Sequence, residues 1–525
     1  MSDQINGTTP DSGEQDAMAI VAEADTGARS PSGIPAKILW YVLLAWACFQ
    51  LWLASPLPFM LRIGIFTSTE ARSIHLAFAI FLAFLAFPAL KRSPRHYIPI
   101  QDWIIALVAA FCAGYQYLFF IELSERPGLP TPMDIVVSVI GLALILEGTR
   151  RALGPPLMIV AAVFMSYTFF GHLAPEVIQW QGASLNKAMS HYYLTTEGVY
   201  GIALGVSTSL VFLFVLFGSL LEKAGAGNYF IRVAFALLGH MRGGPAKAAV
   251  VSSAMTGLIS GSAIANVVTT GTFTIPLMRK VGFSAEKAGA VEVASSTNGQ
   301  LTPPIMGAVA FLMIEYVGIS YVEVIKHAAL PALISYIALV YIVHLEACKA
   351  DMKGLPRRSP PNFIRSLMSF LLTFLGLVVL TAVVYFGLGW MKDAFGEATL
   401  WVALVLLVIT YVALVYYGCK FPELDTELEI TELPEPAPTI KAGLYYLLPV
   451  VVLVWCLTVE RLSPGLSAYY ATLFMLFVLL TQRPLKAIIR KTGEDVAGCL
   501  KDGVTDTLEG LISGARNMIG IGVAT

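Results

Sequence analysis

The chain has 525 residues, of which 57% are hydrophobic and 13% are charged, and its mean hydropathy is +0.72. A soluble domain has no core large enough to bury so much apolar surface, so the composition predicts an all-α polytopic membrane protein. The formal net charge of -1 argues against nucleic acid as a partner. The six cysteines are scattered without a CxxC pair, which favours buried or reduced thiols over a metal site.

The first 36 residues form a polar segment rich in Gly, Ser, Asp and Glu. It is too poor in apolar residues to fold, and no basic n-region precedes the first apolar run. We therefore predict a disordered cytoplasmic tail and no cleaved signal peptide.

Residues 37–172 contain five apolar stretches close to the length of about 20 residues that spans a bilayer. Basic residues fall in alternate connections, which by the positive-inside rule places the N-terminus in the cytoplasm. The segment 172–196 is then exterior and long enough to contact a partner, although a solvated loop is the plainer interpretation. The five expected spans are 38–54, 73–90, 103–121, 133–147 and 155–171, of which the fourth is short.

A sixth span is expected at 198–222, and a shorter apolar stretch follows at 228–238. Because this stretch is too short to cross and carries Arg232, we predict a helix lying along the membrane interface. A buried helix inside the bundle is the alternative.

The long apolar run 248–278 has two basic residues before it and two after it. Basic flanks at both ends are hard to reconcile with a single crossing, so we predict a hairpin over 243–280 that enters from the cytoplasm, turns at Gly261 and leaves on the same side. The flanking residues are Arg242, Lys247, Arg279 and Lys280.

The next expected element is a broken crossing helix over 288–317. Pro303 and Pro304 remove amide donors and clash with the preceding turn, while Gly299 makes unusual backbone angles cheap. The sequence therefore predicts two half-helices separated near Asn298.

The remaining sequence predicts further spans and one acidic, Pro-rich cytoplasmic loop, 422–438. A thirteenth span starts near Leu511. In all we expect about 12 complete transmembrane helices plus one re-entrant hairpin and one broken helix. The later spans are placed at 322–345, 363–388, 398–418, 442–459 and 464–481.

The two breaks carry hydroxyl and amide oxygens at predicted membrane depth. A half-helix that begins there presents amides and suits a carboxylate, whereas one that ends there presents carbonyl oxygens and suits a cation. The breaks hold no Asp or Glu, which favours sodium over a divalent ion. Close packing of helices by small residues is the competing interpretation. The oxygen-bearing residues are Ser262, Asn266, Ser295, Thr297 and Asn298.

Glu292 is an ionisable residue inside the broken span. We expect it to pair with a basic neighbour such as Lys287 near the interface, with titration as the alternative role. No GxxxxGK[ST] loop, GxSxG or HExxH motif is present, so the sequence indicates neither an ATPase nor an enzyme, and it suggests no cofactor other than sodium as a coupling ion.

Three segments of the middle block resemble the large permease subunit of a tripartite ATP-independent periplasmic (TRAP) transporter: GSAIAN at 261–266, TIPLM at 274–278 and STNGQLTPP at 296–304. Two others, EGTRRALG at 147–154 and YLTTEG at 193–198, resemble the TAXI branch, in which the small and large membrane subunits are fused. The similarity extends over about residues 38–525.

The resemblance implies a sodium-driven, elevator-type importer in the bacterial inner membrane. It implies that a small organic acid, a carboxylate, is delivered by a periplasmic substrate-binding protein. It adds Gly261 and Gly299 to the sodium ligands. It further implies that the substrate contacts Ser262, Ala263, Asn266, Thr297, Asn298, Pro303 and Pro304.

By the same resemblance, residues 37–172 correspond to the small subunit and act as a scaffold, and residues 173–347 form the first of two inverted repeats. Additional helices and the acidic loop occupy residues 348–440, and residues 441–525 form the start of the second repeat. Its hairpin and Thr-Pro-Pro break are not in this sequence, so the resemblance implies a C-terminal truncation. Two alternatives remain: a direct sodium/carboxylate symporter without a binding protein, and a non-transporting membrane scaffold.

Overall fold

The computed structural model describes residues 28–90, 92–356, 396–423, 433–491, 493 and 495–525, with four isolated residues between 375 and 394. The predicted span at 363–388, most of the polar tail and most of the acidic loop lie outside these residues. The described chain is all-helical and contains no strand, as the composition predicts. It divides into two compact units, Met1–Phe212 with Ala515–Thr525, and Leu213–Gly514.

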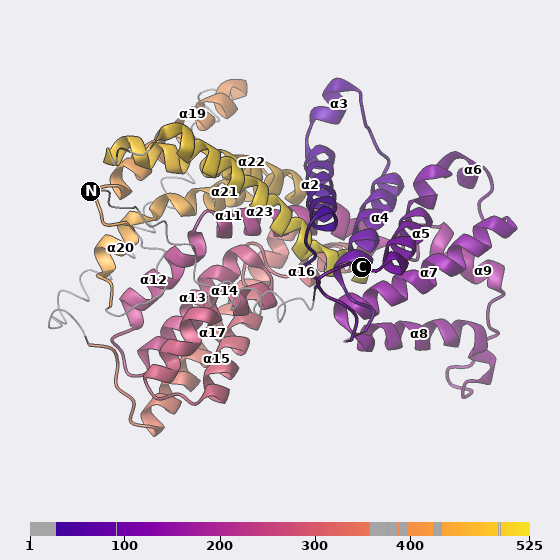
Figure 1. The fold of residues 1–525 in the computed structure, drawn as a ribbon, viewed down its shortest axis with the longest axis horizontal. Helices are drawn as coiled ribbons and strands as arrows, with labels where there is room; N and C mark the ends of the chain where they lie inside the picture. The colour runs from indigo at the N-terminus through magenta and orange to yellow at the C-terminus, as the bar shows by residue number, and fades with distance from the viewer. Residues whose placement is uncertain are drawn as a thin grey trace, which may run out of the picture. The chain divides into compact units, whose positions relative to one another are not determined.

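The first unit is built around α4 and α5, which pack along each other and against α2 and α7 (Figure 1). Capping explains where two of these helices begin, because Thr67 caps α4 with Glu70 and Thr131 caps α7 with Asp134. The helices of this unit are α2 (Ile34–Ala54), α3 (Leu57–Leu61), α4 (Ser68–Ala86), α5 (Ile100–Leu118), α6 (Phe120–Glu125), α7 (Pro132–Leu153), α8 (Pro155–Phe170), α9 (Leu185–Met189) and α10 (Ile202–Val206).

The fourth predicted span is longer than expected. Helix α7 has 22 residues, because the cap at Thr131 starts it early and Glu147 pairs with Arg150 and Arg151 in its last turns. The prediction that this span is short is therefore wrong.

Buried charge in the first unit is paired with opposite charge. Asp102, which is 5% exposed, accepts from Arg29 at 2.5 Å and from Arg151 at 2.8 Å. Asp134 is fully buried and accepts from Arg126 at 3.0 Å and from the hydroxyl of Tyr115 at 2.7 Å. These pairs tie the described start of the chain and the loop before α7 to the helices.

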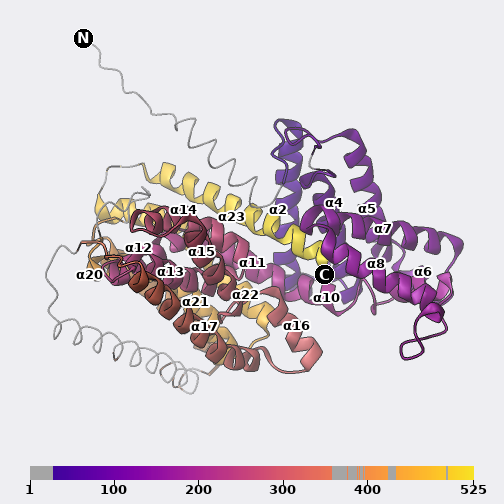
Figure 2. The same ribbon diagram turned by 90° about the horizontal axis from the view of Figure 1, so that it is seen from below.

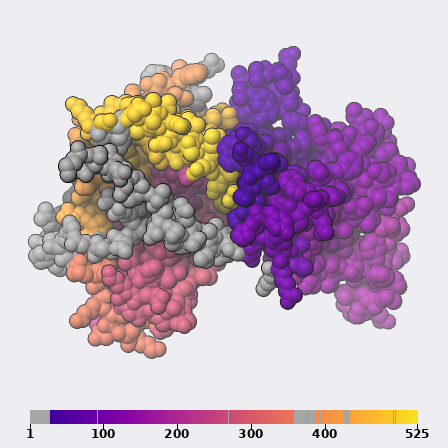
Figure 3. Space-filling model, viewed as in Figure 1, coloured from indigo at the N-terminus to yellow at the C-terminus, as the bar shows by residue number. Residues whose placement is uncertain are grey.

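Large apolar side chains cover much of the outer surface of the first unit, which is indigo to purple in Figure 3. Ile159, Val163 and Phe164 of α8 are each more than half exposed. A soluble unit rarely exposes such continuous apolar surface, so this surface fits a lipid environment.

The second unit contains the helices of the hairpin and of the break. Figures 1 and 2 show α13, α14, α15 and α17 lying side by side, and these four helices contact one another. The helices of this unit are α11 (Phe212–Lys223), α12 (Ala226–Leu238), α13 (Gly244–Ser260), α14 (Ala263–Lys280), α15 (Ala285–Asn298), α16 (Ala308–Val317), α17 (Tyr321–Lys349), α19 (Thr399–Gly418), α20 (Pro436–Ala442), α21 (Leu448–Thr458) and α22 (Pro464–Arg490), and α23 (Val496–Ala524) up to Gly514.

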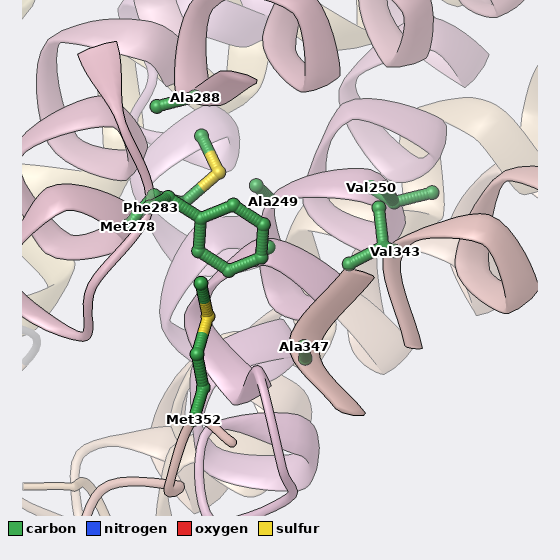
Figure 4. Packing of buried hydrophobic residues seen from close by; sticks show 9 residues of the cluster. Ala249, Val250, Met278, Phe283, Ala288, Val343, Ala347 and Met352 are labelled. Carbon is green, nitrogen blue, oxygen red and sulfur yellow. The ribbon is translucent and has the colours of Figure 1, made fainter. Parts of the chain in front are cut away.

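A hydrophobic cluster holds the ends of α13, α14, α15 and α17 that lie away from the hairpin turn. Figure 4 shows Phe283 and Met352 in its middle, with side chains of all four helices around them. This packing fixes the base of the hairpin. The labelled members are Ala249, Val250, Met278, Phe283, Ala288, Val343, Ala347 and Met352.

Helix α12 is a buried helix, so the prediction of an interfacial helix at 228–238 is wrong. It is buried on most of its faces and packs against α13, α14 and α20. Arg232 does not require an interface, because its Nε donates to Oδ1 of Asn228 one turn earlier at 3.2 Å. The buried alternative is therefore the observed one.

Eight helices within the described residues are long and apolar enough to cross a membrane, and a bent pair, Pro436–Ala442 with Leu444–Thr458, makes a possible ninth. The chain is thus a multi-pass membrane protein. Helix α5 is less apolar, with polar residues at both ends. The eight are Ile34–Ala54, Ser68–Ala86, Pro132–Leu153, Pro155–Leu173, Ile202–Lys223, Tyr321–Lys349, Trp401–Gly418 and Pro464–Arg490.

Candidate binding site at the hairpin and the helix break

The predicted hairpin is present as two antiparallel helices, α13 and α14, joined at Gly261. This glycine has φ 58°, a left-handed conformation that favours glycine. Ser262 then caps α14 by accepting a hydrogen bond from the amide of Ala265 at 3.3 Å. The turn is therefore fixed by local chemistry at two consecutive residues.

The predicted break is also present. Helix α15 ends at Asn298, the short 3-10 helix η4 (Gly299–Leu301) follows, and α16 begins at Ala308. The intervening chain is held by the amide of Gly307, which donates to the carbonyl of Gln300 at 2.8 Å, and by Tyr321, whose hydroxyl donates to the carbonyl of Pro304. The break is thus an ordered segment.

The hairpin tip lies directly against the break. A Cβ added to Gly261 would stand 2.1 Å from the carbonyl oxygen of Met306. One turn further down, a Cβ on Gly257 would stand 2.5 Å from Cα of Gly299. Glycine is therefore required at both positions for the backbones to approach so closely.

Asn266 is the polar centre of the hairpin and is 1% exposed. Its Oδ1 accepts from the hydroxyl of Thr256 at 2.6 Å, and its Nδ2 donates to the carbonyl of Ser253 at 3.0 Å. A Cβ on Gly299 would lie 3.3 Å from Nδ2. Asn266 thus links both arms of the hairpin beside the end of α15.

The structure brings most of the predicted site residues together, but not in equivalent roles. Ser295 is buried and donates within its own helix to the carbonyls of Val291 and Glu292. Thr297 is exposed and donates to the carbonyl of Val293 at 2.7 Å. The remaining predicted residues are half-buried around the tip and the break: Gly261, Ser262, Ala263, Asn298, Pro303 and Pro304.

Glu292 does not pair with Lys287, so that prediction is wrong. Lys287 is 53% exposed and pairs with Glu346 on α17. The two positions are five residues apart, which places them on different sides of the helix. Glu292 is fully buried and faces the hairpin.

Four hydroxyl groups surround the Glu292 carboxylate. Ser253 and Ser296 each donate to Oε1 at 3.3 Å. Thr270 contacts Oε1, and Thr274 contacts Oε2. The sequence alone did not predict this cluster. The signal was available in part, because Asn266, Thr270 and Thr274 recur every four residues on one helix face.

Within the described residues, no group of three or more His, Cys, Asp or Glu side chains could hold a metal ion. The tip, the break and Glu292 offer hydroxyl, amide and carboxylate oxygens, which are the kind of ligand that hard ions prefer.

The family model described as "Tripartite ATP-independent periplasmic transporter, DctM component" matches residues 140–473. This match includes the hairpin, the break and α17, and it extends over more than half of the chain.

Individual relatives are similar over shorter stretches. The chain is 26% identical over 260 residues to the sialic acid TRAP transporter large permease protein SiaM of Vibrio cholerae, covering 50% of this chain and 58% of that protein. It is 31% identical over 145 residues to the C4-dicarboxylate TRAP transporter large permease protein DctM of Vibrio cholerae, covering 28% and 31%. It is 31% identical over 103 residues to the ectoine TRAP transporter large permease protein TeaC of Halomonas elongata, covering 20% of this chain and 24% of that protein.

The chain therefore spans little more than half the length of the curated relatives it matches, and less for most of them. The family match and the apolar helices nevertheless agree on the class of protein. From them we conclude that the chain belongs to the DctM family of TRAP transporter permease components, a family of membrane transporters and not of enzymes.

Proposed function

We propose that the chain is the membrane permease component of a sodium-coupled importer that receives small organic acids from a periplasmic substrate-binding protein. Support comes from the family match and from relatives named for sialic acid, C4-dicarboxylates and ectoine. Each of these compounds carries a carboxylate, which suits the amide ends of half-helices.

The observation that carries the proposal is the contact between the hairpin tip and the break. Helix α14 begins at Ala263 and α15 ends at Asn298. The amides at the start of α14 and the carbonyl oxygens at the end of α15 therefore lie close together. Paired helix ends of this kind are how transporters hold an anionic substrate and its coupling cation close together.

In this proposal sodium binds among the oxygens of Gly261, Ser262, Asn266, Ser295, Thr297, Asn298 and Gly299. The carboxylate contacts Ser262, Ala263, Asn266, Thr297 and Asn298, and Pro303 and Pro304 keep the break open. The buried position of Asn266 and the closeness of Gly299 support this arrangement.

The finer expectations belong to the same proposal. They are a fused permease of the TAXI branch in the bacterial inner membrane, about twelve spans with a cytoplasmic N-terminus, and an elevator-like motion of a transport domain against a scaffold of residues 37–172. The proposal also includes two inverted repeats, and residues 441–525 form the start of the second one. The alternation of basic connections supports the orientation.

Uptake into proteoliposomes tests the proposal. The complete gene product is reconstituted with its binding protein, and labelled organic acid is supplied with an inward sodium gradient. We expect uptake only when both the gradient and the binding protein are present. Uptake that is equally fast in choline would contradict sodium coupling, and uptake without the binding protein would favour a direct symporter.

A further inference from the structure

The Glu292 cluster forms an oxygen-rich centre that the tip and the break do not include. It joins three helices, because Ser253 comes from α13, Thr270 and Thr274 come from α14, and Ser296 comes from α15 together with Glu292. All five residues are fully buried. The centre therefore consists of six side-chain oxygens without access to bulk water.

No basic side chain contacts this carboxylate within the described part of the chain. Two basic residues on the same helices contact other groups, since Lys287 pairs with Glu346 and Lys247 contacts His344 at 3.0 Å. A buried carboxylate in a membrane protein is costly unless a positive charge accompanies it or a proton neutralises it. Hydroxyl groups reduce that cost, but they supply no charge.

Some of these oxygens are spaced as in a coordination shell, whereas the hydroxyls of Thr270 and Thr274 contact the carboxylate directly. Oε1 of Glu292, Oγ of Ser253 and Oγ of Ser296 form a nearly equilateral triangle with sides of 3.3, 3.3 and 3.4 Å. Oγ1 of Thr270 lies 3.3 Å from Oγ of Ser253. Oxygens held about 2.4 Å from a hard cation stand roughly 3.4 Å apart when they subtend a right angle at it.

The hydroxyl of Thr270 can present a lone pair to a cation because its hydrogen has another acceptor. Oγ1 of Thr270 lies 2.7 Å from the carbonyl oxygen of Asn266, which can take its hydrogen. Asn266 in turn bonds Ser253 and Thr256, so the cluster is connected to the hairpin tip by direct hydrogen bonds. Gly271 allows Glu292 to approach α14 closely, because a Cβ there would meet Cγ of Glu292 at 3.1 Å.

We propose that Glu292, Ser253, Thr270, Thr274 and Ser296 form a second sodium-binding site, behind the hairpin tip, in which the ion neutralises the buried carboxylate. A single carboxylate with neutral oxygens favours a monovalent over a divalent cation. The inference rests on the proposed sodium-coupled function and adds a site to it. A bound ion would also hold α13, α14 and α15 together as one body.

The test is a sodium titration of thermal stability with the complete purified protein, at constant ionic strength with choline as the replacement cation. We expect sodium to raise the melting temperature of the wild-type protein. Glu292→Gln should raise the half-maximal sodium concentration about tenfold or abolish one phase of the response. Glu286→Gln is the matched control, because it removes an exposed carboxylate from the same helix and should leave the titration unchanged.

A second variant keeps the test decisive if Glu292→Gln does not fold. Thr274→Val retains the shape of the side chain and removes one oxygen, and it should weaken the sodium response several-fold. A wild-type protein that responds to sodium while Glu292→Gln or Thr274→Val responds identically would overturn this site and leave sodium coupling intact. A wild-type protein with neither sodium-dependent stability nor sodium-dependent uptake would overturn both.

Discussion

Glu292 in the second unit has different partners from the two buried aspartates of the first unit, Asp102 and Asp134. In the first unit Asp102 and Asp134 each accept hydrogen bonds from arginine. In the second unit Glu292 is equally buried but is surrounded by serine and threonine. An ion pair made by the protein is permanent and stabilises a fixed structure. In the proposal made above, the positive charge beside Glu292 comes from a cation that can leave.

This difference matches the roles proposed for the scaffold, residues 37–172, and for the helices of the hairpin and the break. Fixed pairs suit a scaffold, whereas exchangeable charge suits the part that binds and releases ions. The glycines of the second unit also differ in their surroundings. Gly257 and Gly261 allow close backbone contact at the tip, whereas Gly289 in α15 has no atom within 4 Å of an added Cβ.

The largest effect is expected from breaking the fixed pair in the first unit. Asp102→Ala leaves Arg29 and Arg151 buried without their shared carboxylate, and we expect a loss of about 3–5 kcal/mol of stability. Thermal unfolding of the purified protein measures this loss. Glu122→Gln changes an exposed carboxylate of the same unit and serves as the control. A melting temperature equal to that of the control would show that the pair is not structural.

A smaller loss is expected at the hairpin tip. Gly261→Ala forces a side chain into a left-handed conformation and against the carbonyl of Met306, which should cost about 1–3 kcal/mol and reduce uptake. Gly289→Ala is the matched change in an open helical position and should be neutral or stabilise by up to about 1 kcal/mol. Equal behaviour of the two variants would contradict close contact between tip and break.

Asn266→Ala tests the hydrogen bonds that join the two arms of the hairpin. It leaves the hydroxyl of Thr256 without its side-chain acceptor, and we expect a loss of about 1–3 kcal/mol together with weaker sodium stabilisation. Thr272→Ala removes an exposed hydroxyl from the same helix that donates to the carbonyl of Thr269 within that helix, and its stability should stay close to that of the wild-type protein. The two melting curves, recorded with and without sodium, make the comparison.

The smallest effect is expected from the exposed pair of Lys287 with Glu346. Exposed ion pairs contribute little because water and salt screen them, so Lys287→Met should leave both the melting temperature and the sodium titration nearly unchanged. A loss of sodium response as large as that of Glu292→Gln would show that Lys287, and not a bound cation, supplies the charge near Glu292.

Much of the second unit could be predicted from the sequence because its signals are local. Basic residues on both sides of the 248–278 run indicate a hairpin, Gly261 marks the turn, and Pro303 with Pro304 marks the break. The structure has a turn and a break at these positions. That the hairpin re-enters the membrane stays a prediction.

The surroundings of Glu292 could not be predicted, because three of its four hydroxyl partners come from other helices. Sequence spacing shows that Ser296 lies one turn after Glu292, but not that Ser253 and Thr270 face it from the hairpin. For the same reason the sequence predicts a helix at the membrane interface where the buried α12 lies. The amphipathic pattern alone does not show which neighbours cover a helix.

A density map of the complete protein in sodium, compared with one in choline, tests the central claim most directly. We predict density for an ion between Glu292 and its four hydroxyls in sodium, with oxygens at about 2.4 Å, and none in choline. Identical maps, with the hydroxyls bonded to the carboxylate and no ion among them in either salt, would contradict the claim that an exchangeable cation neutralises this buried carboxylate.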